Sequence, residues 1–204
     1  MSLTATRHRE SIRAYLLASA ESTRTAADLC AGDLAKAARL IADAFRAGGK
    51  LLNCGNGGSA ADAQHIATEF TSTLTRSFVR DPLPAIALTT DTSFLTAFSN
   101  DFGFDDVFSR QVMALGRKSD VLLGLSTSGN SVNVVRAAEA AKRLGMSAIA
   151  FTGSGGGKLA PIADIAVRVP ADATGHIQET HIALYHAMCF EVEEMLFPGR
   201  GGTG

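Results

Sequence analysis

The chain begins with a long stretch in which apolar positions recur at helical spacing. Within residues 8–47, apolar side chains recur three and four positions apart, first over residues 12–20 and then over residues 34–45. This pattern predicts two helices ahead of any strand, and Gly48 and Gly49 are expected to end the second one. We therefore expect residues 1–49 to form a helical N-terminal region.

The remainder of the chain alternates between apolar runs of strand length and helical stretches. The apolar runs lie at residues 50–54, 84–88, 120–125, 147–151 and 165–169. Strands that alternate with helices favour an α/β fold with a doubly wound, flavodoxin-like, five-stranded parallel sheet, in which ligands bind beyond the carboxyl ends of the strands. A long C-terminal helix follows at about residues 175–197. We expect residues 50–197 to form this domain and residues 198–204 to be a disordered tail, because the tail is poor in apolar side chains.

Composition and charge exclude several classes of partner. The 204 residues, 46% of them hydrophobic, suffice for one α/β domain with a full core. A net charge of −1 provides no overall field for nucleic acid or an anionic membrane surface. The first 25 residues lack the apolar core of a signal peptide, and no run approaches the ~18 apolar residues of a membrane helix, so we expect a cytoplasmic protein. The three cysteines are expected to be buried, reduced thiols.

Two turns that follow predicted strands have the composition of anion-binding loops. The first, Gly55–Asp62, reads Gly-Asn-Gly-Gly-Ser-Ala-Ala-Asp, and its glycines let backbone N–H groups approach an anion at a helix N-terminus. A purely structural turn explains this segment equally well. The second, Leu125–Ser131, carries four hydroxyls in six positions, which is more than one helix cap requires. We therefore predict that the second turn binds phosphate. Neither turn has the form of a triphosphate or dinucleotide loop.

Titratable side chains lie on two of the predicted helices. His65 and Glu69 are four positions apart and share one face of the helix after the first turn. On the last helix, Gln178 and His186 are about two turns apart among apolar residues. Each pair alone is more often structural. Together with two turns of anion-binding composition, they indicate a site for proton transfer on a phosphorylated substrate.

Four runs along the chain resemble bacterial phosphoheptose isomerases of the sugar-isomerase (SIS) domain family: Cys54–His65, Ser99–Phe104, Gly124–Ser131 and Ile177–His181. The resemblance covers nearly the whole chain. It implies an aldose-ketose isomerase that converts sedoheptulose 7-phosphate to D-glycero-D-manno-heptose 7-phosphate through a cis-enediol, the first step of nucleotide-activated heptose biosynthesis. It also implies a homotetramer with active sites at subunit interfaces, on which the N-terminal helices pack.

The resemblance assigns roles to individual positions. It implies that Glu69 and His186 are the acid-base pair. It implies a zinc ion, one per subunit, held by His65, Glu69, Gln178 and His186. The implied substrate-binding set is Asn56, Gly57, Gly58, Ser59, Glu69, Asn100, Asp101, Ser126, Thr127, Ser128, Ser131 and Gln178. One position departs from the pattern: many members carry an arginine one helical turn after the glutamate, where this chain has Thr73.

Two alternatives stay open. The first is a non-catalytic SIS-domain binding protein, such as the regulator that binds a replication initiator. Such relatives typically lack the acid-base residues, whereas Glu69 and His186 are both present here. The second is an isomerase or sensor for another sugar phosphate, such as arabinose 5-phosphate or a hexose phosphate. No DNA-binding helix-turn-helix is left over in 204 residues, which disfavours the sensor.

Overall fold

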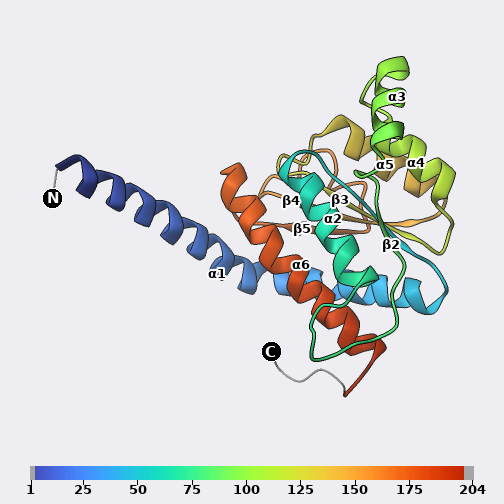
Figure 1. The fold of residues 1–204 in the computed structure, drawn as a ribbon, viewed down its shortest axis with the longest axis horizontal. Helices are drawn as coiled ribbons and strands as arrows, with labels where there is room; N and C mark the ends of the chain where they lie inside the picture. Colours follow the sequence, from blue (N-terminus) through green and yellow to red (C-terminus); the bar gives the residue numbers. More distant parts are fainter. Residues whose placement is uncertain (1–2, 200–204) are drawn as a thin grey trace.

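The computed structural model describes residues 3–199, with side chains from residue 6 onward, and it shows a five-stranded parallel sheet between two layers of helices (Figure 1). The strands are β1 (Leu51–Cys54), β2 (Ala85–Ala87), β3 (Val121–Leu125), β4 (Ser147–Thr152) and β5 (Ile165–Arg168). The helices are α1 (Leu3–Arg46), α2 (Gly58–Thr71), α3 (Thr92–Phe102), α4 (Val107–Leu115), α5 (Val132–Arg143) and α6 (Thr174–Leu196). The predicted sheet and the predicted long last helix are confirmed.

The order of the strands places the turns after β1 and β3 next to each other. The sheet has the order β2-β1-β3-β4-β5, so β1 pairs with β2 on one side and with β3 on the other. β2 is therefore added on one side of β1, whereas β3, β4 and β5 follow on the other side. Cys54 lies opposite Gly124, which brings the carboxyl ends of β1 and β3 to the same level. Ligands of doubly wound sheets bind at such a switch point.

Successive side chains of each strand face opposite helix layers. On β3, Leu123 and Leu125 pack toward α1, α2 and α6, whereas Leu122 packs toward α4 and α5. Both faces of the sheet are therefore covered, which explains why the strands are apolar throughout instead of alternating with polar residues. The layer formed by α1, α2 and α6 sets α2 beside α6.

The prediction of two N-terminal helices was wrong, because α1 is a single helix of 44 residues. The stretch between the two predicted helices contains Ala26 and Cys30, which are buried and continue the helical spacing to Leu34. Gly32 lowers helix propensity by about 1 kcal/mol relative to alanine, which is too little to end a helix that packs on the core.

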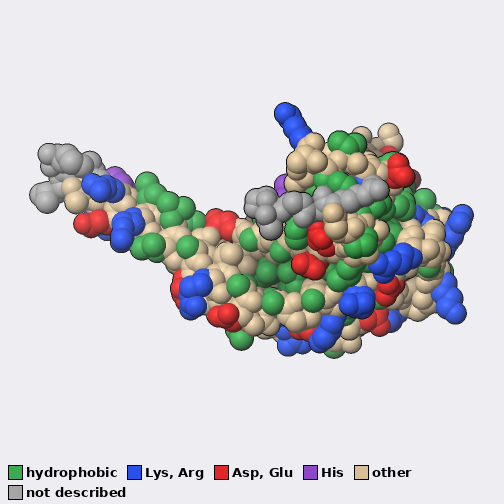
Figure 2. Space-filling model, turned by 90° about the horizontal axis from the view of Figure 1, so that it is seen from below, with side chains coloured by type: hydrophobic (Ala, Val, Ile, Leu, Met, Phe, Trp, Pro, Cys, Tyr) green, Lys and Arg blue, Asp and Glu red, His purple; other side chains and the backbone are tan. Residues whose placement is uncertain are grey.

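The first half of α1 projects from the body of the molecule (Figures 1 and 2). Its large apolar side chains Ile12, Leu16 and Leu17 are exposed. Near the start of α6, Tyr15 donates a hydrogen bond of 3.0 Å to the Glu179 carboxylate. The second half of α1 packs against α6 and the sheet. The single chain thus leaves an apolar face of α1 uncovered.

The three cysteines lie in the interior of the fold. Cys30, Cys54 and Cys189 are free and buried, as predicted, and burial raises the pKa of the Cys54 thiol to about 12. No helix within residues 3–199 is long and apolar enough to cross a membrane. Of the predicted disordered tail, Pro198 and Gly199 form a turn after α6, and residues 200–204 lie outside the described residues.

Candidate active site

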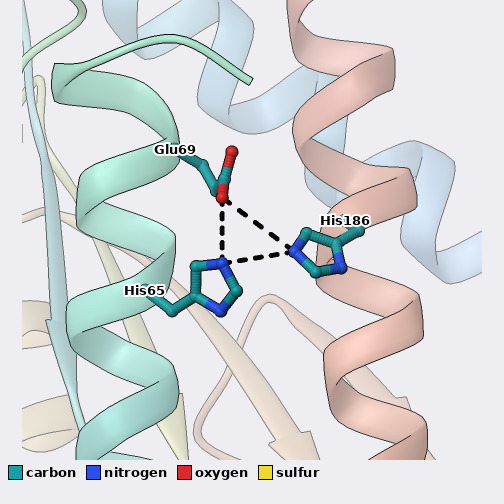
Figure 3. Close-up of side chains that lie close together, drawn as sticks. All are labelled: His65, Glu69 and His186. Atoms are coloured by element: carbon teal, nitrogen blue, oxygen red, sulfur yellow. Dashed lines mark hydrogen bonds and ion pairs between the residues drawn. The ribbon is translucent and has the colours of Figure 1, made fainter. Parts of the chain in front are cut away.

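Three titratable side chains meet where α2 lies beside α6 (Figure 3). His65 and Glu69 come from α2 and His186 comes from α6, and one ligand atom of each lies within 4.8 Å of the other two. His65 Nε2 is 2.9 Å from Glu69 Oε1. His186 Nε2 is 3.4 Å from His65 Nε2 and 4.0 Å from Glu69 Oε1. The spacing of four residues on α2 places both of its side chains on the face toward α6.

Two buried side chains lie behind His65. The hydroxyl of Tyr185 is 2.8 Å from His65 Nδ1, and it donates a bond of 3.5 Å to Asp62 Oδ1. Burial raises the pKa of Asp62 to about 6, although the bond from Tyr185 and the charge of His65 oppose the shift. Burial and the nearby Asp62 carboxylate raise the pKa of Tyr185 well above its usual value. Burial therefore makes Asp62 harder to ionise than an exposed aspartate, and it favours the neutral phenol of Tyr185.

Arg80, from the loop between α2 and β2, joins the end of α2 to α6. Its side chain is 1% exposed, and its Nε lies 2.6 Å from a carboxylate oxygen of Glu193 on α6. The other nitrogens of Arg80 donate to the carbonyl oxygens of Glu69 at 2.7 Å and Phe70 at 2.8 Å. These carbonyls belong to the last turn of α2 and have no partner within the helix. The ion pair therefore fixes the turn that carries Glu69 relative to α6.

The turn after β1 is joined to the first turn of α5 by a reciprocal pair of amide hydrogen bonds. Asn56 Nδ2 donates to Asn133 Oδ1 at 2.8 Å, and Asn133 Nδ2 donates to Asn56 Oδ1 at 2.9 Å. Gly57 has a φ of 56°, which a residue with a side chain adopts only under strain. At Gly58, an added Cβ would lie 2.7 Å from Nε2 of Gln178. The first turn thus needs glycine at position 57, whereas a side chain at position 58 would displace the Gln178 amide that packs directly against it.

The hydroxyls of the turn after β3 are not consumed by helix capping. Ser131 is the N-cap residue of α5, yet its side chain makes no capping bond. Instead, the hydroxyls of Ser126 and Ser131 lie 3.0 Å apart, and the Ser128 hydroxyl accepts a bond of 3.1 Å from the Asn130 backbone N–H. The turn therefore carries hydroxyls beyond those that capping of α5 uses.

A pocket of 110 Å³ lies beside the first turn, lined by Gly55, Asn56, Gly57, Ala60, Thr89, Leu95, Phe104 and Phe108. Asn100 and Asp101, which were also predicted to bind substrate, are exposed at the end of α3, and the Asn100 amide donates to Asp101 at 2.9 Å. Within residues 6–199, no hydrogen bond joins them to either turn. The pocket formed by this chain is therefore small and open.

Comparisons with known proteins decide the family. Residues 14–153 match the SIS domain family. A phosphoheptose isomerase of Rhodospirillum rubrum is 51% identical over 92% of this chain and 98% of its own length. One of Akkermansia muciniphila is 47% identical over 93% of this chain and 99% of its own length. The chain belongs to the phosphoheptose isomerases of the SIS domain family. The resemblance inferred from the four sequence runs is confirmed.

A solved phosphoheptose isomerase structure shows the same architecture. The enzyme of Neisseria gonorrhoeae superimposes with a TM-score of 0.86 at 47% identity, over 91% of this chain and 98% of that chain. This superposition leaves little of either chain outside the shared fold. The α1 and α6 helices, which flank the sheet in sequence, are thus part of the phosphoheptose isomerase architecture.

The phosphoheptose isomerase fold brings together most of the predicted site residues. Three of the four predicted metal-binding residues form the cluster of His65, Glu69 and His186. The fourth, Gln178, lies against Gly58 at the start of α2, two helical turns before His186 on α6. The residues predicted in the two turns gather at the switch point between β1 and β3. Asn100 and Asp101, on α3, do not join them within this chain.

Four side chains of this phosphoheptose isomerase site were missed by the sequence analysis: Asp62, Arg80, Asn133 and Tyr185. A local signal existed for Asp62, which precedes His65 by three positions and so shares its helix face. Arg80 had no such signal, because it reaches α2 from a loop. Thr73, the position that departs from the family pattern, lies beyond the end of α2, and its hydroxyl donates to the carbonyl oxygen of Phe78.

Proposed function

We propose that the chain interconverts sedoheptulose 7-phosphate and D-glycero-D-manno-heptose 7-phosphate, the first step toward nucleotide-activated heptose. The observation that supports this most strongly is the cluster of His65, Glu69 and His186 beside the switch-point turns of a phosphoheptose isomerase fold. Aldose-ketose isomerisation requires a base that moves a proton between two carbons and an acid that protonates oxygen. A carboxylate flanked by two imidazoles supplies both.

The proposed chemistry divides between Glu69 and His186. Glu69 removes the proton from the carbon beside the carbonyl, which gives a cis-enediol, and returns a proton to the neighbouring carbon. His186 moves protons on the two substrate oxygens, so that carbonyl and hydroxyl exchange places. The His186 side chain is 42% exposed and that of Glu69 is 14% exposed. A substrate can therefore reach the pair from the solvent-exposed side of the contact between α2 and α6.

The two turns serve as the anchor for the rest of the substrate. The hydroxyls after β3 donate to the 7-phosphate, and the N-terminal end of α2 adds backbone N–H groups. Binding far from the reacting carbons fixes their position over Glu69. The proposed binding set is Asn56, Gly57, Gly58, Ser59, Glu69, Asn100, Asp101, Ser126, Thr127, Ser128, Ser131 and Gln178.

The donor set of the cluster fits Zn²⁺. Ligand atoms around a tetrahedral zinc ion at its usual bond lengths lie ~3.4 Å apart. The three observed separations, 2.9, 3.4 and 4.0 Å, bracket that value. We propose His65, Glu69 and His186 as ligands, with Gln178 as the fourth. When bound, the ion would polarise the substrate oxygens.

We also propose that the chain acts as a homotetramer with active sites at subunit interfaces. The exposed apolar face of α1, with Ile12, Leu16 and Leu17, and the exposed Phe102 on α3 supply surfaces for association. The small, open pocket and the isolated position of Asn100 are consistent with a site that a neighbouring subunit completes. A sugar-phosphate substrate and three free thiols favour the reducing cytoplasm.

The test is a substrate panel. The purified chain is incubated with sedoheptulose 7-phosphate, arabinose 5-phosphate or fructose 6-phosphate, with added zinc or with a chelator, and products are followed by NMR. We expect conversion of sedoheptulose 7-phosphate above the others and its loss with the chelator. Conversion of only another sugar would identify a different isomerase. Binding without conversion of any sugar would favour the binding-protein alternative.

A further inference from the structure

The turn after β3 is held from one side by the loop that follows β4. This loop, residues 153–159, contains four glycines and is called the β4 loop below. The carbonyl oxygen of Thr127 accepts a hydrogen bond of 2.9 Å from the Gly153 N–H, and that of Gly129 accepts one of 2.9 Å from the Leu159 N–H. Backbone bonds therefore tie the turn to both ends of the β4 loop.

A third connection runs through the side chain of Asn130. Its oxygen accepts a hydrogen bond of 3.1 Å from the Lys158 N–H, and its nitrogen donates one of 2.9 Å to the Ser128 carbonyl oxygen. Asn130 is exposed, so its side chain contributes nothing to the core. Its bonds link the β4 loop to the backbone of the turn.

These contacts set the direction of the peptide groups in the turn. In a planar trans peptide, the C=O of one residue and the N–H of the next point in opposite directions. The Thr127 carbonyl faces the β4 loop, so the Ser128 N–H faces away from it. Within residues 6–199, the N–H groups of Thr127 and Ser128 have no hydrogen-bond acceptor. Free backbone N–H groups beside hydroxyls are donors that suit an anion.

The two segments approach each other too closely for a side chain at Gly157. A Cβ added there would lie 2.5 Å from the Ser128 carbonyl oxygen and 2.5 Å from the Gly129 carbonyl carbon, and the φ of Gly157 is 54°. Gly155, in the same loop, has a positive φ in neither sense of strain nor any atom within 4 Å of an added Cβ. Contact with the turn therefore requires glycine at position 157 and leaves position 155 free.

We propose that the β4 loop positions the turn after β3 for phosphate binding. By holding the carbonyl side of the turn, it keeps the Ser128 N–H and the hydroxyls of the turn directed at the phosphate. Gly157 and Asn130 are the positioning residues, and neither belongs to the proposed substrate-binding set. The inference rests on the proposed role of the turn as the phosphate anchor.

The test measures the binding of inorganic phosphate to the full-length protein by ³¹P NMR titration, which does not depend on turnover. Gly157→Ala should weaken phosphate binding at least about 10-fold, because the added Cβ displaces the turn and misaligns its donors. Asn130→Ala should also weaken phosphate binding, because it removes the bonds to Ser128 and Lys158. If Gly157→Ala does not fold, Asn130→Ala alone decides the result.

Two other glycine substitutions are matched controls. Gly155→Ala adds the same methyl group to the same loop, but in open space. Gly145→Ala, ahead of β4, has a φ of 74° and would make only ordinary contacts, so it introduces backbone strain away from the turn. Both should bind phosphate as the wild type does, although Gly145→Ala should unfold at a lower urea concentration. Equal weakening in Gly145→Ala and Gly157→Ala would overturn the proposal, because lost stability alone would explain it.

Replacing Ser126 and Ser128 together by alanine separates this inference from the proposed function. If that variant binds phosphate more weakly while Gly157→Ala and Asn130→Ala bind it as the wild type does, the turn is the anchor and the role of the β4 loop is overturned. If that variant binds phosphate as the wild type does, or if the wild type binds none, the proposed anchor fails and the inference fails with it.

Steady-state kinetics with sedoheptulose 7-phosphate supply a second readout. In Gly157→Ala, KM should rise at least about 10-fold while kcat changes little, because the reacting groups on α2 and α6 are untouched. Gly155→Ala should leave both constants unchanged. A loss in Gly157→Ala that is confined to kcat would overturn the positioning of the phosphate by the β4 loop.

Discussion

The candidate site has two regions that are assembled in different ways. One is the contact between α2 and α6 that holds His65, Glu69 and His186, called the seam below, and the other is the pair of turns at the switch point. In the seam, His65 and His186 come from positions 121 residues apart and are held by buried partners such as Tyr185 and Arg80. In the turns, the hydroxyls follow directly after a strand, and Asn56 is bonded to Asn133 at the start of α5. Proton transfer thus depends on the core, whereas anchoring depends on local sequence. Substitutions in the two regions should therefore have separable effects.

The largest expected effect is on stability, from Arg80→Met. This change leaves Glu193 buried without its partner and removes the Arg80 donor from the Glu69 carbonyl oxygen at the end of α2. Breaking a buried ion pair in this way costs about 3–5 kcal/mol, measured by urea unfolding at fixed protein concentration. The matched control is Lys50→Met, which breaks the partly buried pair with Asp120 at the opposite end of β1. Turnover per folded molecule should fall only in Arg80→Met. Equal turnover in both variants would contradict a role of Arg80 in placing Glu69.

His186→Ala should lower kcat about 100-fold, which corresponds to about 2.7 kcal/mol, because the acid that serves the substrate oxygens is lost. KM should change little, because the turns still anchor the phosphate. Steady-state kinetics with the heptose phosphate measure both constants. His8→Ala, on the exposed part of α1, is the matched control and should behave as wild type. A large rise in KM at unchanged kcat would show that His186 binds the substrate and does not transfer protons.

His181 provides a pH-dependent test of a histidine outside the cluster. It is fully buried, its Nε2 lies 3.3 Å from the Thr152 carbonyl oxygen, and burial lowers its pKa to about 4. The unfolded chain takes up the proton near pH 6.5, so stability is lost as the pH falls from about 6.5 to 4. His181→Gln should remove about 2 kcal/mol of this loss at pH 5 relative to pH 8. Parallel pH profiles of stability for both proteins would show that His181 does not titrate in this way.

The smallest expected effect comes from the turn after β3. Replacing Ser126 and Ser128 together by alanine should raise KM about 10-fold, or about 1.4 kcal/mol, with kcat reduced only slightly. Ser22→Ala, on the exposed surface of α1, is the control and should leave both constants unchanged. A loss confined to kcat would remove the distinction between the anchoring turns and the seam.

The sequence predicted the features that depend on local pattern. Each strand was recognised from its apolar run, and the turns after β1 and β3 from their glycines and hydroxyls. The break in α1 was predicted wrongly because Ala26 and Cys30 are small and give a weak apolar signal, although they are buried. Helical spacing paired His65 with Glu69. Spacing could not show that Tyr185 or Arg80 reaches them, because those contacts depend on how α6 and a loop pack against α2.

The role of Glu69 as the catalytic base is tested most directly by measuring the transfer of solvent hydrogen to the substrate carbon. Wild type and Glu69→Gln are incubated with sedoheptulose 7-phosphate in D₂O, and NMR follows both aldose formation and deuterium at the carbon that receives the proton. Glu69 as the base predicts conversion with solvent deuterium in the wild type. It also predicts at least a ~100-fold slower reaction in Glu69→Gln, with binding of the sugar phosphate retained. Near-normal conversion by Glu69→Gln would show that Glu69 is not the base.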